Sequence, residues 1–219
     1  MNHWSGYLLL IAKGAQMTVE LTVLGIALAL VAAFVAGLAR VSRFSAVRAL
    51  AIAYIEFFRG TSVFVQLFWA YFVLPMAGFD VTPLQAGVLA LGLNVGAYAA
   101  EVVRGAVQAV SGDQRQACVA LNLSRYQAMR HVILPQALPL MIPTFGNNAI
   151  ELLKGTAVVS LISLGDMTFQ AQVVRSQTGN TLIPFTTILA LYFVMSWLIT
   201  FGMRRLERRV SFGLDGMRR

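Results

Sequence analysis

The strongest constraint on this chain is a set of long apolar runs that carry almost no charge. Residues 21–39, 60–79 and 182–203 contain no Asp, Glu, Lys or Arg, and residues 84–103 contain only Glu101. A helix needs about 20 apolar residues to cross a bilayer, so each run is long enough. Charged residues make up 12% of the chain, against about 25% in a soluble domain. These runs predict a protein that crosses the membrane several times.

The chain divides into three parts by composition. Residues 1–18 include the aromatic side chains Trp4 and Tyr7 and are typical of an interfacial segment at headgroup level. Residues 19–205 hold the apolar runs and form the predicted transmembrane domain, and residues 206–219 form a basic cytoplasmic tail. We therefore predict an all-α polytopic membrane protein of five transmembrane helices with an N-terminal interfacial helix.

The fourth predicted span starts near Val132 and differs from the others in its prolines. It carries Pro135, Pro139 and Pro143, and a proline inside a helix removes a backbone hydrogen bond. Unpaired backbone groups at membrane depth are tolerated mainly where they line a cavity. We expect this span to be a broken helix beside a solute pathway.

A long polar stretch, residues 111–135, is predicted to form two short helices joined by a tight turn. Two residue pairs have the three-residue spacing of a helix-capping box: Ser111 with Gln114, and Ser124 with Gln127. Asn122 stands where the first helix should end, and asparagine tolerates the left-handed conformation that is common there. The spacing predicts a small apolar face made of Ala117, Cys118 and Leu121.

Two helices with a turn can also indicate a DNA-binding protein, since the chain has a net charge of +8. That interpretation requires a soluble domain around the two helices. Residues 81–100 before the stretch and residues 132–150 after it carry no charge. A stretch held between two membrane spans is better explained as a docking element for a partner protein at the membrane surface.

The distribution of basic residues predicts the orientation of the chain. If residues 111–135 lie in the cytoplasm, 13 of the 17 Lys and Arg residues lie there too. This is what the positive-inside rule requires. The predicted N-terminus is then outside and the C-terminus is cytoplasmic, which fits an odd number of spans.

Residues 111–135 resemble the coupling loop of the permease subunits of bacterial ABC importers, and we use that name for them below. The family pattern is E-A-A, three residues, G, nine residues and I-x-L-P, and the chain keeps this spacing. The predicted ATPase-coupling residues are Gln116, Ala117, Cys118, Leu121, Asn122, Leu123, Val132, Leu134 and Pro135.

Three further segments resemble the polar amino acid branch of that family (histidine, glutamine and glutamate types). The segments are Arg59-Gly60-Thr61 with Val65-Gln66 and Leu74-Pro75, Ala97-Tyr98-Ala99-Ala100-Glu101 with Arg104-Gly105, and Leu152-Leu153-Lys154-Gly155-Thr156. Gly155 stands where the family pattern has Asp. The lack of that acid argues against a strongly cationic solute, because a carboxylate would pair with one directly.

The resemblance implies the type I ABC importer permease fold and a division of labour between subunits. The chain would be the permease subunit of an ATP-driven importer in the bacterial inner membrane, for polar amino acids or zwitterions such as ectoine and hydroxyectoine. Its expected partners are a cytoplasmic ABC ATPase dimer, a homologous or identical second permease and an external solute-binding protein. The sequence has no G-x-x-x-x-G-K-[ST] loop. ATP and Mg²⁺ are therefore expected on the ATPase, with no cofactor in this chain.

Polar residues within the spans are candidates for the solute pathway, because such residues usually face a cavity or a partner. The candidates are Asn94, Tyr98, Asn147, Asn148 and Glu151. Hydrogen bonding between helices is the alternative role for these side chains. Two further pairs have ion-pair spacing on a helix and are predicted to be structural: Glu56 with Arg59, and Glu101 with Arg104.

The residues suggest neither catalysis nor a metal site. The chain has one cysteine and two distant histidines, and no nucleophile stands beside a base. Two other functions stay open at this point. An ion-gradient-driven secondary transporter or channel for small polar solutes would need no ATPase, and a membrane anchor for a sensor complex would need no pathway.

Overall fold

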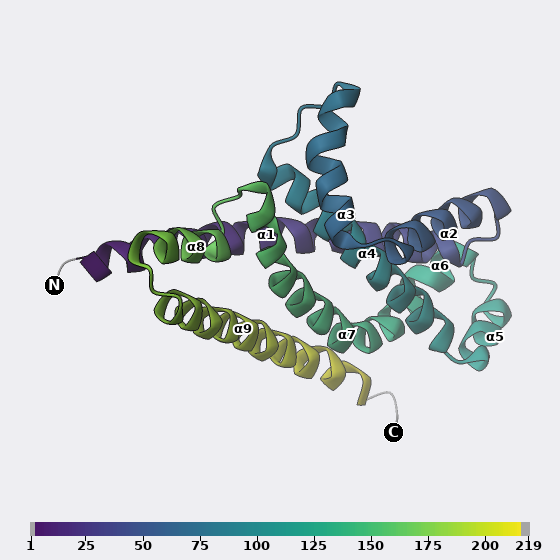
Figure 1. Ribbon diagram of the computed structural model, residues 1–219. Coiled ribbons are helices and arrows are strands. Elements are labelled where there is room, and N and C mark those ends of the chain that lie inside the picture. The colour runs from purple at the N-terminus through teal and green to yellow at the C-terminus, as the bar shows by residue number, and fades with distance from the viewer. Residues whose placement is uncertain (1–2, 216–219) are drawn as a thin grey trace.

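The computed structural model describes residues 3–215, and every regular element in that range is a helix (Figure 1). The long helix α1 (His3–Arg40) packs along α4 (Pro83–Ala109) over its C-terminal half. Its N-terminal part contacts α8 (Met167–Thr178), which leads into the long helix α9 (Leu182–Asp215). The predicted all-α class is confirmed.

Three single helices are long and apolar enough to cross a membrane: Leu9–Arg40, Pro83–Ala109 and Leu182–Val210. Two bent pairs pass the same test together: Ser45–Gly60 with Val63–Ala77, and Arg125–Ile162 with Met167–Thr178. The described residues therefore offer three to five spans, and the predicted number of five is reached when each bent pair counts as one span.

The N-terminal region differs from the prediction of a separate interfacial helix. α1 continues without a break past residue 18, where that segment was expected to end. The hydroxyl groups of Thr18 and Thr22 donate to the carbonyl oxygens of Gly14 (3.0 Å) and Thr18 (2.7 Å), so both are satisfied within the helix. No proline occurs in residues 1–40 to end a helix. The interfacial segment and the first span therefore form one helix, while residues 1–2 and 216–219 lie outside the described residues.

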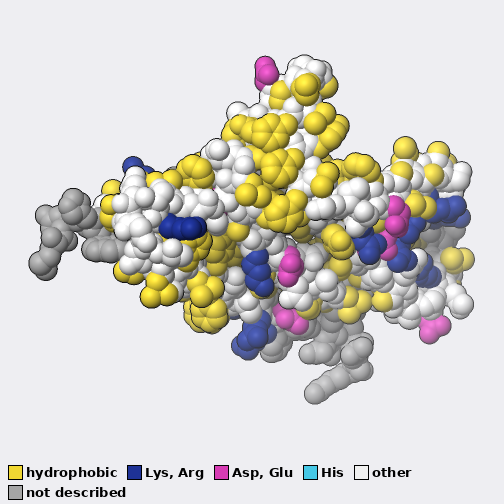
Figure 2. Space-filling view, viewed as in Figure 1, with side chains coloured by type: hydrophobic (Ala, Val, Ile, Leu, Met, Phe, Trp, Pro, Cys, Tyr) yellow, Lys and Arg dark blue, Asp and Glu magenta, His cyan; other side chains and the backbone are white. Residues whose placement is uncertain are grey.

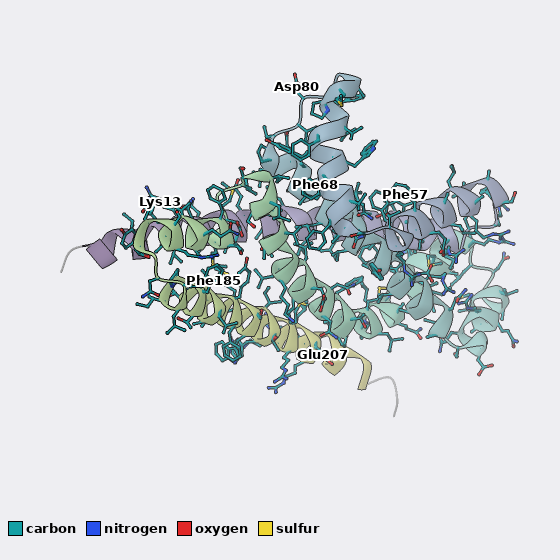
Figure 3. All side chains as sticks on the ribbon, viewed as in Figure 1. Lys13, Phe57, Phe68, Asp80, Phe185 and Glu207 are labelled. Atoms are coloured by element: carbon teal, nitrogen blue, oxygen red, sulfur yellow. The ribbon has the colours of Figure 1, made fainter. Side chains whose placement is uncertain are left out.

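The second span is sharply bent. α2 (Ser45–Gly60) and the limb that starts with α3 (Val63–Phe68) meet at 104°. The limb continues as the π-helical turn η1 (Trp69–Val73) and the 3-10 helix η2 (Leu74–Ala77). It projects from the rest of the molecule in Figure 1, hydrophobic side chains cover much of it in Figure 2, and Figure 3 places Asp80 near its tip.

The coupling loop leads directly into the fourth span. The loop contains the short helices α5 (Gly112–Ala120) and α6 (Arg125–Ala128). The π-helical turn η3 (Met129–Ile133) joins α6 to α7 (Leu134–Gly155), and the 3-10 helix η4 (Thr156–Ile162) follows. The loop and the span therefore share one continuous helical path.

The fourth span is not broken at its prolines, contrary to the prediction. α7 stays helical through Pro139 and Pro143. Its buried residues Met141 and Gly146 belong to the contacts with α4 and α9, and a Cβ at Gly146 would lie 3.1 Å from Met203. Neighbouring helices thus hold α7 in shape despite the missing donors. The conformation changes only after Gly155, where η4 begins.

A buried carboxylate attaches α8 to α1. Asp166 is fully buried, and its carboxylate accepts hydrogen bonds from the backbone N–H groups of Thr168 (3.1 Å) and Phe169 (3.0 Å). This is an N-cap of α8. The backbone N–H of Met167 donates to Thr18 Oγ1 (3.2 Å), so the start of α8 is bound to the side of α1.

Two glycines of α4 pack closely against α1. A Cβ at Gly92 would lie 2.9 Å from Leu28 Cδ2, and a Cβ at Gly96 would lie 2.9 Å from Ala32 Cβ. The hydrogen atoms of these glycines let α1 and α4 approach closely. Gly92 and Gly96 have the G-x-x-x-G spacing that is typical of close helix contacts, and here the contact lies within the subunit.

We predict that Gly96→Ala destabilises the protein by about 1–3 kcal/mol, because the new methyl group overpacks the contact with α1. The matched control is Gly105→Ala on the same helix, where a Cβ would have no neighbour within 4 Å. The measurement is the temperature at which the detergent-solubilised protein loses its monodisperse peak. Equal temperatures for the two variants would contradict the role of Gly96.

Candidate coupling loop and solute pathway

Local side-chain caps build the two helices of the coupling loop. The backbone N–H of Gln114 donates to Ser111 Oγ (3.4 Å) at the start of α5. At the start of α6 the capping box is complete, because the N–H of Gln127 donates to Ser124 Oγ (3.3 Å) and the N–H of Ser124 donates to Gln127 Oε1 (2.9 Å). Both predicted caps are present, the first with one hydrogen bond and the second with two.

The turn between the helices depends on Asn122. This residue has a φ angle of 51°, one of two positive values among the described non-glycine residues. The backbone N–H of Leu123 donates to the carbonyl of Cys118 (2.9 Å), which closes the end of α5. The left-handed conformation predicted for Asn122 is confirmed, and it provides the C-cap geometry.

The predicted apolar face of the coupling loop is divided between two sides. Cys118 points inward and is 3% exposed, whereas Leu121 is 73% exposed and Ala117 is also exposed. Tyr126, at 67%, adds to the outward side. Exposed apolar side chains on a polar loop mark a contact surface for another protein. We name Ala117, Leu121 and Tyr126 the docking face.

The coupling loop is attached to the spans on both sides. Arg115 Nη2 donates to the carbonyl of Val107 near the end of α4 (2.7 Å), and Gln136 Nε2 of α7 donates to Gln114 Oε1 (3.3 Å). Among the other predicted coupling residues, the half-buried Val132 and Leu134 and the exposed Pro135 lie on the helical path into α7. Gln116 is exposed on α5, and Leu123 is half-buried in the turn after it. A displacement of the loop therefore acts directly on α4 and α7.

One predicted ion pair forms and gains a third member. Glu101 accepts from Arg104 (Nη2–Oε2 2.7 Å) and from Arg40 at the end of α1 (Nε–Oε1 3.1 Å). This carboxylate joins the ends of α1 and α4. The other predicted pair, Glu56 with Arg59, is not among the ion pairs of the described residues. The guanidinium of Arg59 lies instead 5.2 Å from the ring centre of Tyr98, because that exposed ring on α4 offers it a cation–π contact.

The side chain of Asn94 forms hydrogen bonds at the bend between α2 and α3. Its Nδ2 donates to the carbonyl of Phe58 (2.8 Å) and to Gln66 Oε1 (3.1 Å). Gln66 Nε2 donates to the same carbonyl (2.9 Å) and to Thr61 Oγ1 (2.7 Å). These bonds satisfy backbone groups that the bend leaves unpaired. The helix-bonding alternative therefore holds for Asn94.

The polar residues of α7 differ in their exposure. Asn147 and Glu151 are exposed, together with Thr144 and Lys154, and their spacing places all four on one face. We name these four residues the polar face of α7. Asn148 points elsewhere: its buried Nδ2 has no hydrogen-bond partner among the described residues. It borders a small cavity of about 20 Å³ between α1, α4 and α7.

Sequence reasoning missed two residues and misplaced another. Arg40 was not assigned to the Glu101 pair, since it is 61 positions away. Gln66 was quoted within a motif without a role, although a glutamine in an apolar run is itself a signal. Asn148 was listed with Glu151 as a pathway candidate, whereas its Nδ2 is buried beside a small cavity and Glu151 is exposed.

The described residues form an all-helical domain with three to five candidate membrane spans and a polar helical loop that is hydrogen-bonded to them, as in the membrane subunit of a transporter. The sequence matches the family described as binding-protein-dependent transport system inner membrane component over residues 6–212. The chain belongs to this family, whose members are the permease subunits of ABC importers. It is a membrane-embedded transport component and not an enzyme, and the family implies an ATPase and a binding protein as partners.

Individual relatives resemble the chain along nearly its whole length. It is 44% identical over 214 residues to the "Probable amino-acid ABC transporter permease protein y4tF" of Sinorhizobium fredii, covering 95% of this chain and 90% of the relative. It is 38% identical over 204 residues to the glutamine transport system permease protein GlnP of Escherichia coli, covering 92% and 93%.

Solved structures show the same fold. An amino acid ABC transporter crystallised with histidines has a TM-score of 0.86 at 36% identity, covering 94% of this chain and 96% of that chain. The MetNI methionine ABC transporter in an inward-facing conformation has a TM-score of 0.81 at 22% identity, covering 96% and 99%. The type I importer fold expected from the sequence is confirmed.

We predict that Asn122→Val impairs coupling, because a β-branched residue in the left-handed region costs roughly 1–2 kcal/mol. The matched control is Asn122→Gly, which adopts positive φ freely and should keep activity. The measurement is ATP-driven solute uptake and ATPase stimulation in the assembled transporter. Equal activities of the Val and Gly variants would show that the turn does not need this conformation.

Proposed function

We propose that the chain is the permease subunit of an importer for polar amino acids or amino-acid-like zwitterions. The observation that carries the proposal is the polar face of α7, where Thr144, Asn147, Glu151 and Lys154 are exposed within a span candidate. Such groups are expensive in lipid and are retained where they meet a solute or water. The names of the relatives with 44% and 38% identity support an amino acid as the solute.

The mixed charge of this face suits a zwitterion. Glu151 can face the cationic end of the solute, Lys154 can face the carboxylate, and Asn147 can hydrogen-bond to either. Ectoine and hydroxyectoine belong to the same chemical class of solutes. Tyr98 on α4 and Arg59 on α2 form a cation–π pair, and we include Tyr98 among the residues that line the pathway.

The proposed assembly contains two permeases that enclose one pathway. The second permease, identical or homologous, would cover apolar surface that this chain leaves exposed, such as Phe68, Trp69 and Phe72 on the projecting limb. ATP and Mg²⁺ bind to the cytoplasmic ATPase dimer, and this chain carries no cofactor. The N-terminus lies outside and the C-terminus lies in the cytoplasm.

Transport proceeds by alternating access. ATP binding closes the ATPase dimer, the docking face moves with it, and the hydrogen bonds from the coupling loop to α4 and α7 carry the motion to the spans. The binding protein delivers the solute from outside. The alternative of an ion-gradient-driven transporter or channel is not favoured, because the family depends on binding proteins.

We predict that Glu151→Gln reduces solute uptake about tenfold or more. The substitution removes a charged hydrogen-bond partner of the solute and keeps the size of the side chain. Assembly and the stimulation of ATPase activity by loaded binding protein should stay intact. The matched control is Glu20→Gln, an exposed glutamate of α1. Unchanged uptake kinetics in the Glu151 variant would rule out Glu151 as a solute contact.

We predict that Ala117→Asp uncouples transport without unfolding the spans. An unpaired carboxylate on the docking face would be buried against the ATPase at a cost of about 2 kcal/mol, which weakens the affinity for the ATPase roughly thirtyfold. The matched control is Ala77→Asp, an exposed alanine at the far end of η2. Normal uptake and normal ATPase co-purification of the Ala117 variant would reject the docking face.

A further inference from the structure

A groove of about 920 Å³ lies between the end of α1 and the inner side of the coupling loop. Its lining divides into two chemical halves. Leu38, Met129 and Ile133 form an apolar half, and Arg43, Arg115 and Arg125 form a basic half. Figure 2 shows Lys and Arg side chains gathered at the end of the molecule that holds the coupling loop. Its lining shares Arg115 with the proposed transport mechanism, through the hydrogen bond to Val107, but that mechanism gives the groove itself no ligand.

The positive charge of the groove is not balanced by this chain. None of its three arginines forms an ion pair with a carboxylate of the described residues, and no Asp or Glu lines the groove. Arg115 donates to a backbone carbonyl, and the guanidinium of Arg43 lies 4.7 Å from the ring centre of Phe44. Three cations around one opening attract an anion strongly.

The apolar half of the groove lies at the level where the spans end. Leu38 belongs to the last turn of α1, and Ile133 directly precedes α7. In the proposed topology these apolar side chains lie at the ends of spans, and the arginines lie beyond those ends in the connecting segments. A ligand that fills it needs an anionic group at one end and a hydrocarbon chain at the other.

We propose that this groove binds an anionic phospholipid of the cytoplasmic leaflet. The phosphate lies between Arg43 and Arg125, which form charge-assisted hydrogen bonds with it, and an acyl chain lies against Leu38 and Ile133. A lipid is favoured over an acidic protein segment because Leu38 and Ile133 of the lining belong to span candidates. The inference rests on the proposed cytoplasmic position of the coupling loop. A lipid bound there holds the coupling loop against α1.

The test uses the assembled transporter, purified with its ATPase from membranes that contain phosphatidylglycerol and phosphatidylcholine. Native mass spectrometry measures the ratio of the two lipids that stay bound. We expect the wild type to retain phosphatidylglycerol preferentially. Arg43→Gln should reduce that preference roughly fivefold, since each basic residue contributes about that factor, and Arg43→Lys should keep most of it.

The control is Arg48→Gln, an exposed arginine of α2 that does not line the groove and should leave lipid retention unchanged. No preference in the wild type, or equal losses in the Arg43 and Arg48 variants, would overturn the proposal. A third outcome would also overturn it. If the double variant Arg43→Gln/Arg125→Gln loses the ATPase but still retains phosphatidylglycerol, the groove binds the ATPase and not a lipid. If the chain retains phosphatidylglycerol as expected but no ATPase ever co-purifies with it, the proposed function is rejected and the lipid site is still supported.

Discussion

The absence of water in the bilayer core requires the protein itself to satisfy every backbone group at that depth. The structure meets this requirement at the bend between α2 and α3, where the carbonyl of Phe58 accepts from both Asn94 and Gln66. Without these two side chains, a 104° bend within a span would leave polar groups exposed to hydrocarbon. The projecting limb therefore depends on two amides from different helices.

The same logic explains how the other irregular parts are held. Asp166 caps α8 and the Thr18 hydroxyl binds its first turn, so the bend after η4 is also closed by side chains. Glu101 joins Arg40 and Arg104 where α1 and α4 end. Between these fixed points, α1 and α4 pack through Gly92 and Gly96 with almost no space between them. The result is a stiff helix pair to which the mobile part of the proposed mechanism, the coupling loop with α7, can be attached.

Local features were predictable because their cause is local. The caps at Ser111 and Ser124 and the left-handed turn at Asn122 depend on residues within five positions, and spacing is enough to find them. Partners between helices could not be predicted from spacing. Glu56 and Arg59 share a face as expected, but the nearby Tyr98 ring attracts the guanidinium. Spacing indicates which side chains share a face of a helix, but it does not identify the residues of other helices that pack against that face.

By itself, the sequence determined that the chain is a five-span membrane protein with a polar coupling loop, because apolar run length and helix capping are properties of short segments. Only the tertiary structure decided what each polar residue of the spans contacts. It committed Asn94 to the bend, turned Asn148 toward α1 and α4, and left Asn147 and Glu151 exposed. The physical reason is that a side chain in a membrane protein is satisfied by whichever helix lies beside it, and that neighbour is fixed by packing across the whole fold.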